Sequence, residues 1–239
     1  MALIKRARWA LRSFLGQYPW LYFPLLHLIR SPRRHLHVRR DTEIVIEGYP
    51  RSANTFAVAA FQFAQGRPVK IARHLHAPAQ IIQAVHWRIP TIVLIRNPED
   101  AVLSLLVREP RISACQALLD YVRFYRKIQP YYSHFILATF EEVTSDFGTI
   151  IERVNKKFRT AFKPFVYSDE NVAQVMQIVE EMDKEDQHKA NVTETTVARP
   201  SEIRTQLKER RRKELENPYI MKLLEKAREV YQEMIEMGS

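Results

Sequence analysis

The chain has 239 residues, 46% hydrophobic and 27% charged, a composition typical of one globular domain with a sizeable core. Its single cysteine, Cys115, excludes an internal disulfide, and we expect a reducing, cytoplasmic compartment. The formal net charge is +10, and residues 1–40 contain nine Lys or Arg and no acid, so +9 of that charge lies in an N-terminal arm. Residues 41–239 are close to neutral and form the expected main domain.

The arm, residues 1–40, is predicted to contain an amphipathic helix. Its apolar stretch, residues 14–29, is interrupted by Pro19 and Pro24 and is shorter than the roughly 20 residues of a membrane-spanning helix. No small-residue cleavage site follows it, so we expect no signal peptide. Helical spacing separates two faces of this helix. The apolar face contains Ile4, Ala7, Leu11 and Phe14, and the basic face contains Lys5, Arg8 and Arg12.

Such an arm has three potential surroundings. We expect the helix to pack on the domain and to leave its basic face in water. The alternative is a helix that lies on an anionic membrane surface, which would make the protein peripheral to a membrane. A basic arm also attracts nucleic acid, but the sequence contains no RNA- or DNA-binding motif, and we expect no nucleic-acid partner.

Behind the arm, strands and helices are predicted to alternate. In chain order the patterns predict strand 43–47, helix 55–65, short strand 69–73, helix 77–87, strand 91–95, helix 98–108, helix 113–129 and strand 134–138, followed by about a hundred mostly helical residues. Strand 91–95, "TIVLI", is the clearest, because it is apolar, β-branched and bounded by prolines. This order predicts an α/β fold with a central parallel sheet covered on both faces by helices.

The segment "GYPRSANTF", residues 48–56, follows the first strand and opens a helix. The phosphate-binding pattern G-x-x-x-x-G-K-[ST] is met at Gly48 and Thr55, whereas Ala53 and Asn54 replace the second glycine and the lysine. Backbone N–H groups at a helix N-terminus still favour an anion there. The side chains of Ser52, Asn54 and Thr55 add donors, and Arg51 is a candidate replacement for the lysine.

The strand at 91–95 ends in Arg96-Asn97-Pro98. A kinase or ATPase needs an acid near this point to hold magnesium. A cation in its place favours direct binding of a second anion. The loop and Arg96 together therefore predict a site for a ligand with two anionic groups.

These residues resemble the sulfotransferases that use 3′-phosphoadenosine 5′-phosphosulfate (PAPS). "YPRSANTF" (49–56) is similar to the family's 5′-phosphosulfate loop, Y-P-K-S-G-T-T-W, and "RNPEDAVLS" (96–104) to its 3′-phosphate motif, R-N-x-x-D-x-x-x-S. "HLHAP" (74–78) resembles the K-T-H-L-P segment with the catalytic histidine, and "FEEV" (140–143) the Y-E-D segment beside the adenine. The resemblance covers about residues 42–165 and implies a P-loop-like three-layer fold.

Position by position, the resemblance implies roles for ten residues. Arg51 matches the lysine that acts on the bridging oxygen, although its planar fork replaces a point charge. His76 matches the catalytic base, and His74 is a second candidate. The expected donor contacts are the loop residues Arg51, Ser52, Ala53, Asn54 and Thr55, the adenine-stacking Phe56, and the 3′-phosphate ligands Arg96 and Ser104.

The family's C-terminal R-K-G loop is not recognisable in this chain. The segment "ARPSEIR", residues 198–204, is a candidate substitute. The run "KERRRKE", residues 208–214, is most simply a solvated helix face, with a contact to the 3′-phosphate or to an anionic acceptor as the alternative.

The implied reaction moves a sulfuryl group to a hydroxyl or amine of a carbohydrate, lipid or phenol. A transferred sulfuryl group carries less charge than a γ-phosphate, so no metal is required in principle. His74 and His76 have the spacing of metal ligands, but the sequence offers no third ligand, and we expect no metal. Two alternatives stay open: a P-loop kinase with a degenerate loop, and a basic membrane-surface protein without catalysis.

Overall fold

The computed structural model describes residues 2–29, 35–187 and 202–238. The N-terminal arm forms α1 (Ala2–Leu15) and α2 (Pro19–Leu28). The domain continues with β1 (Ile44–Gly48), α3 (Asn54–Gln65), β2 (Ile71–Arg73), α4 (Pro78–His86), β3 (Thr91–Ile95), α5 (Pro98–Arg108), α6 (Ala114–Ile128), β4 (Ile136–Thr139), α7 (Phe140–Ser145), α8 (Phe147–Phe158), α9 (Asp169–Gln187), α10 (Glu202–Arg212) and α11 (Pro218–Glu236). The predicted strands and helices are confirmed, with ends displaced by up to two residues.

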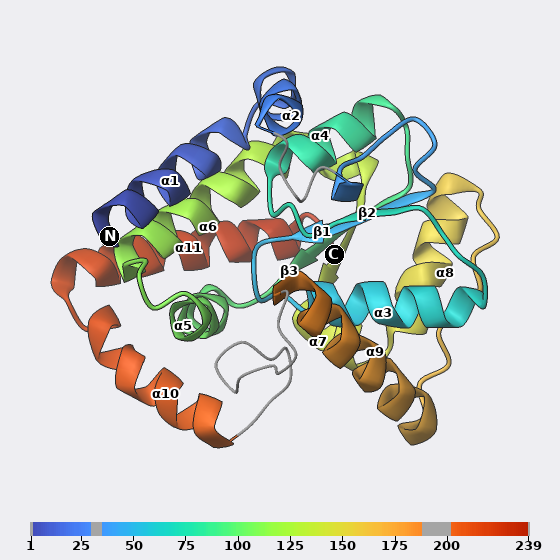
Figure 1. Ribbon diagram of the computed structural model, residues 1–239. Coiled ribbons are helices and arrows are strands. Elements are labelled where there is room, and N and C mark those ends of the chain that lie inside the picture. The colour runs from blue at the N-terminus through green and yellow to red at the C-terminus, as the bar shows by residue number, and fades with distance from the viewer. Residues whose placement is uncertain (1, 30–34, 188–201, 239) are drawn as a thin grey trace.

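The four strands form one parallel sheet in the order β2-β1-β3-β4 (Figure 1). Side chains of β3 alternate between two buried cores. Val93 and Ile95 join the core under α4, α5, α6 and α11, whereas Ile92 and Leu94 join the core under α3, α8 and α9. The sheet is therefore the middle of three layers, and the predicted α/β fold with a covered parallel sheet is confirmed.

The carboxyl ends of β1 and β3 lie side by side, since Gly48 pairs with Leu94. A Cβ on Gly48 would lie 2.4 Å from the carbonyl oxygen of Leu94, so the strand requires glycine where it turns into the loop. The loop after β1 and the Arg96 segment after β3 consequently leave the sheet at neighbouring points, where ligands bind in open α/β sheets.

The helix α1 packs on the domain, as expected, but through a different face. Trp9 Nε1 and Ser13 Oγ both donate to the buried carboxylate of Asp120 on α6, Ser13 at 2.5 Å. Arg12 donates to the carbonyl oxygen of Leu75 at 2.8 Å. The expectation of a basic face in water holds for the exposed Arg8, whereas Arg12 is half-buried at this contact and Ile4, Leu11 and Phe14 are exposed. The packing side is set by the polar contacts, because a buried carboxylate needs hydrogen-bond donors.

Burial is the main influence on Asp120 and raises the pKa of its carboxyl group, while the hydrogen bonds from Ser13 and Trp9 act in the opposite direction.

Among the described residues, no helix combines the length and the apolar character needed to cross a bilayer.

Candidate anion-binding site

The loop between β1 and α3 is held in an unusual backbone conformation. Arg51 and Ala53 both have positive φ, 71° and 65°, in the left-handed region that glycine adopts most easily. Asn54 begins α3 and donates from Nδ2 to the carbonyl oxygen of Tyr49 at 3.0 Å, which closes the loop. Ser52 is fully buried, and Thr55 is half-buried in the first turn of the helix.

Cationic side chains converge on the hydroxyl of Ser104, in α5. Arg51 donates from Nε to Ser104 Oγ at 3.0 Å, and Arg204 donates from Nη2 to the same oxygen at 3.1 Å. Arg204 lies on α10 and is 4% exposed, and Ser104 is 3% exposed. Two guanidinium groups on one buried hydroxyl repel each other, so an anion bound between them would be strongly favoured.

Arg96 completes this cluster from the end of β3. Its Nη1 donates to the carbonyl oxygen of Arg51 at 3.1 Å, and its guanidinium lies 3.8 Å from the ring centre of Phe140. The hydroxyl of Tyr121 donates to the Arg96 carbonyl at 2.7 Å and fixes the backbone. The Nε of Arg96 is buried and has no hydrogen-bond partner among the described residues, as expected of a donor that awaits a ligand.

Lys208, one turn after Arg204 on α10, is the fourth cation. Burial lowers the pKa of its ammonium group, and the charges of Arg96, Arg204 and Arg51 lower it further, whereas Asp100 opposes the shift. Burial likewise lowers the pKa of Arg96. Lys208 thus lies within electrostatic reach of Arg96, Arg204 and Arg51, and cations this close together favour an anion between them.

The structure thus brings together three residues predicted from the sequence, Arg51, Arg96 and Ser104. It adds Arg204 and Lys208, which the sequence indicated only as members of the segments 198–204 and 208–214. The available signal was their spacing of four residues, which places both on one side of a helix. Residues 198–201 of the first segment lie outside the described residues.

The two candidate bases have different surroundings. His76 Nδ1 lies 2.9 Å from the carbonyl oxygen of Gly48, so Nδ1 carries the proton and donates it. The lone pair is then on Nε2, as a general base requires. His74 is buried, with Nδ1 3.0 Å from Arg73 Nη1, and both histidines have positive φ.

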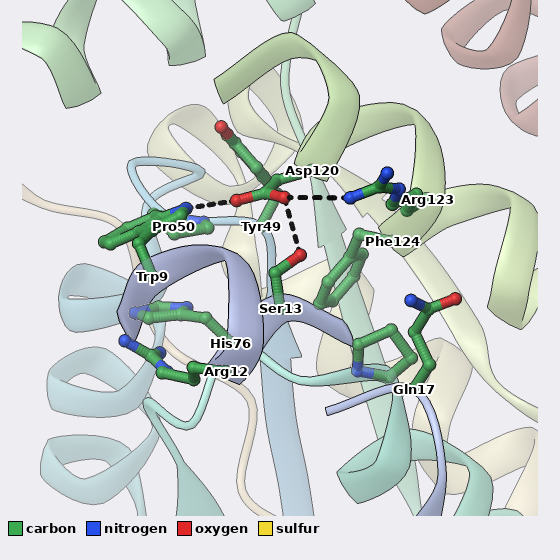
Figure 2. Close-up of a pocket in the computed structure, with 11 residues that line it drawn as sticks. Trp9, Arg12, Ser13, Gln17, Tyr49, Pro50, His76, Asp120, Arg123 and Phe124 are labelled. Atoms are coloured by element: carbon green, nitrogen blue, oxygen red, sulfur yellow. Dashed lines mark hydrogen bonds and ion pairs between the residues drawn. The ribbon is translucent and has the colours of Figure 1, made fainter. Parts of the chain in front are cut away.

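His76 also lines a pocket between the arm and the domain (Figure 2). Its other lining residues are Trp9, Arg12, Ser13, Gln17, Tyr49, Pro50, Pro78, Asp120, Arg123 and Phe124. Four of these belong to residues 1–40, so the arm forms one wall of the pocket. His74 is not among the lining residues, and His76 is therefore the better placed to meet an acceptor.

Glu47 is a site residue that the sequence did not indicate, because it ends an apolar run and has only the pattern of a strand residue. Its carboxylate is fully buried and accepts from the backbone N–H groups of Gly48 at 3.1 Å and Leu75 at 2.9 Å. Gln80 Nε2 donates to it at 2.9 Å, and His76 Nδ1 lies 3.3 Å from Oε1. Glu47 thereby ties the His76 segment to β1.

Replacing Glu47 with glutamine should lower the free energy of unfolding by about 1–3 kcal/mol, because an amide accepts at one oxygen only and leaves buried donors unpaired. Chemical denaturation measures this loss. The matched control is Glu43→Gln, which disturbs a partly exposed pair with Arg67 and should cost less than about 1 kcal/mol. An equal loss in the two variants would contradict the role given to Glu47.

Phe56 lies in the first turn of α3, half-buried, with its ring edge-to-face with Phe165 at 6.5 Å between ring centres. The "FEEV" segment begins α7, where Thr139 caps the helix by accepting from the N–H of Glu142.

Within residues 2–29, 35–187 and 202–238, no three His, Cys, Asp or Glu side chains are grouped as a metal site would need.

No protein-family model matches this chain, and no curated protein matches it by sequence. Among solved structures, the chain is similar to mouse sulfotransferase SULT7A1, crystallised in complex with PAP. The two are 12% identical, and the match covers 79% of this chain and 88% of the mouse chain with a TM-score of 0.40.

Proposed function

We propose that the protein transfers a sulfuryl group from PAPS to an acceptor hydroxyl or amine. One observation carries the proposal: Arg51 and Arg204 both donate to Ser104, and Arg96, at the end of β3, donates to the backbone of Arg51 in the strand-turn-helix loop. Lys208 follows Arg204 by one turn on α10 and feels the charges of all three arginines. A P-loop kinase would use an acid at this strand end to hold magnesium. Four cations instead suit a donor that presents two separate anionic groups.

The residues fit such a donor in two parts. Arg96, Ser104, Arg204 and Lys208 would hold the 3′-phosphate, for which the buried Nε of Arg96 supplies a ready donor. The N-terminus of α3, with Ser52, Asn54 and Thr55, would hold the 5′-phosphosulfate, and Phe56 would lie against the adenine.

Arg51 lies between the two parts, with its backbone bonded to Arg96 and its side chain to Ser104. In the proposed reaction the sulfur–oxygen bond to the 5′-phosphate breaks, and a new bond forms to the acceptor oxygen or nitrogen. Negative charge grows on the leaving phosphate oxygen, where Arg51 and the loop amides would stabilise it. No protein group is covalently modified.

His76 would accept the proton that the acceptor loses. The Gly48 carbonyl fixes the tautomer in which Nε2 is unprotonated, and the buried Glu47 carboxylate, 3.3 Å from Nδ1, helps to hold the ring in this orientation. His74 is the second candidate for this role. Expected acceptors are a carbohydrate, lipid or phenol in the cytoplasm.

Labelled substrates distinguish this proposal from a kinase. With sulfur-labelled PAPS and a panel of hydroxyl acceptors, we expect labelled product at the same rate with and without a metal chelator. Product labelled only from γ-labelled ATP, and only with magnesium, would identify a kinase and reject the sulfotransferase.

A further inference from the structure

The arm turns an apolar face outward. On α1, Ile4, Leu11 and Phe14 are 64%, 58% and 52% exposed. On α2, Trp20 and Leu28 are 74% and 80% exposed. Six of the twelve large hydrophobic side chains exposed among the described residues fall within residues 4–29, so apolar surface is concentrated on the arm rather than scattered.

The outward faces of the two helices are continuous. The rings of Phe14 and Tyr18 lie 5.7 Å apart, and those of Tyr18 and Trp20 lie 6.3 Å apart, which connects α1 to α2 through a row of aromatic side chains. We call this surface, from Ile4 to Leu28, the arm face. Aromatic and aliphatic side chains in such a row are typical of helices that lie in a membrane interface.

Positive charge borders the arm face. Arg8 is exposed next to Leu11 on the helix, and Lys127 Nζ lies 4.6 Å from the ring centre of Tyr18. Residues 1–40 carry nine Lys or Arg and no acid. This charge complements an anionic lipid surface, whereas a second copy of the chain would bring two arms of the same +9 charge together.

The arm face also leads to the candidate active site. Tyr18, Trp20 and Lys127 line a hollow between α2, α4 and α6, and Gln17 lines both this hollow and the pocket that contains His76. Gln17 therefore forms a wall shared by the two cavities, and the arm face lies beside the pocket that contains His76.

We propose that the arm face docks on an anionic lipid surface and that the acceptor is an amphipathic lipid whose headgroup hydroxyl reaches His76 from that surface. The choice of acceptor rests on the proposed sulfuryl transfer, whereas the docking does not. The arm thus has two functions: it anchors the enzyme and forms the wall of the pocket through which the acceptor enters.

Co-sedimentation with vesicles of equal parts phosphatidylglycerol and phosphatidylcholine tests the docking. The wild-type protein should pellet with the vesicles and be partly released by salt. The double variant Phe14→Ser, Trp20→Ser should partition roughly 10- to 100-fold more weakly, because two interfacial side chains are lost. The matched control, Val166→Ser with Met221→Ser, removes two other exposed side chains and should behave as wild type.

Two outcomes overturn the docking: wild-type protein that stays in the supernatant, or a double variant that pellets like the control. A wild-type dimer in the absence of lipid that the double variant abolishes would assign the arm face to a second copy instead. Circular dichroism and the affinity for 3′,5′-adenosine bisphosphate (PAP) verify that each variant is folded.

The acceptor is tested by incubating the protein with sulfur-labelled PAPS and vesicles of phosphatidylglycerol mixed with a galactosyl diacylglycerol. We expect label in the organic extract, reduced in the double variant. PAP binding without labelled lipid would overturn the lipid acceptor and leave the sulfotransferase proposal standing. Vesicle binding without PAP binding would reject sulfuryl transfer and leave the docking standing.

Discussion

Replacing His76 with alanine is expected to lower turnover by roughly 10²–10⁴-fold, the usual effect of removing a general base. The expectation follows from geometry, since Nδ1 is held by the Gly48 carbonyl and Nε2 is left to accept a proton in the pocket beside the arm. Affinity for PAP should change little, because the cations around Ser104 are untouched. Steady-state kinetics with saturating acceptor and donor, together with a PAP titration, measure both quantities.

The matched control for His76→Ala is His134→Ala, which removes an exposed histidine far along the chain and should leave turnover unchanged. The variant His74→Ala tests the second candidate base. Turnover near the wild-type value in His76→Ala, with a large loss in His74→Ala, would transfer the role to His74.

Replacing Arg96 with alanine should weaken PAP binding by about 10- to 100-fold, because charged hydrogen bonds of this kind contribute roughly 1.5–3 kcal/mol each. Binding of adenosine 5′-phosphate, which lacks the 3′-phosphate, should hardly change. The variant should therefore lose most of the preference for PAP. Arg204→Ala should act in the same direction, since both guanidinium groups belong to the cluster around Ser104.

Arg210→Ala is the control for these arginines, because it removes an exposed arginine from α10, the helix that also carries Arg204. Its PAP affinity should match that of the wild type. A loss of affinity for PAP and adenosine 5′-phosphate alike in Arg96→Ala would contradict the 3′-phosphate role.

The fold was largely predictable because its signals are local. Strand 91–95 is a short β-branched run between prolines, and Pro98 with Glu99 and Asp100 marks the start of the next helix. The parallel arrangement follows from the alternation of strands with helices. It also places Arg51 and Arg96 at the same edge of the sheet, and this part of the site was therefore predictable too.

The rest depends on contacts between distant segments. Arg204 reaches Ser104 across 100 residues, and no local pattern shows which face of α10 meets α5. Glu47 reads as the end of a strand, because its partners at Leu75 and Gln80 come from another segment. The side of α1 that packs on the domain was not predictable for the same reason, since Asp120 accepts hydrogen bonds from Trp9 and Ser13, on a helix more than 100 residues earlier.

The most direct test of the central claim is a calorimetric titration of the wild-type protein with PAP and with adenosine 5′-phosphate, each with a metal chelator present. The cluster of Arg51, Arg96, Arg204 and Lys208 predicts that PAP binds tightly without magnesium and that adenosine 5′-phosphate binds at least about 10-fold more weakly. Equal affinity for the two nucleotides, or tight binding of ATP that requires magnesium, would contradict a site built for the 3′-phosphate of PAPS.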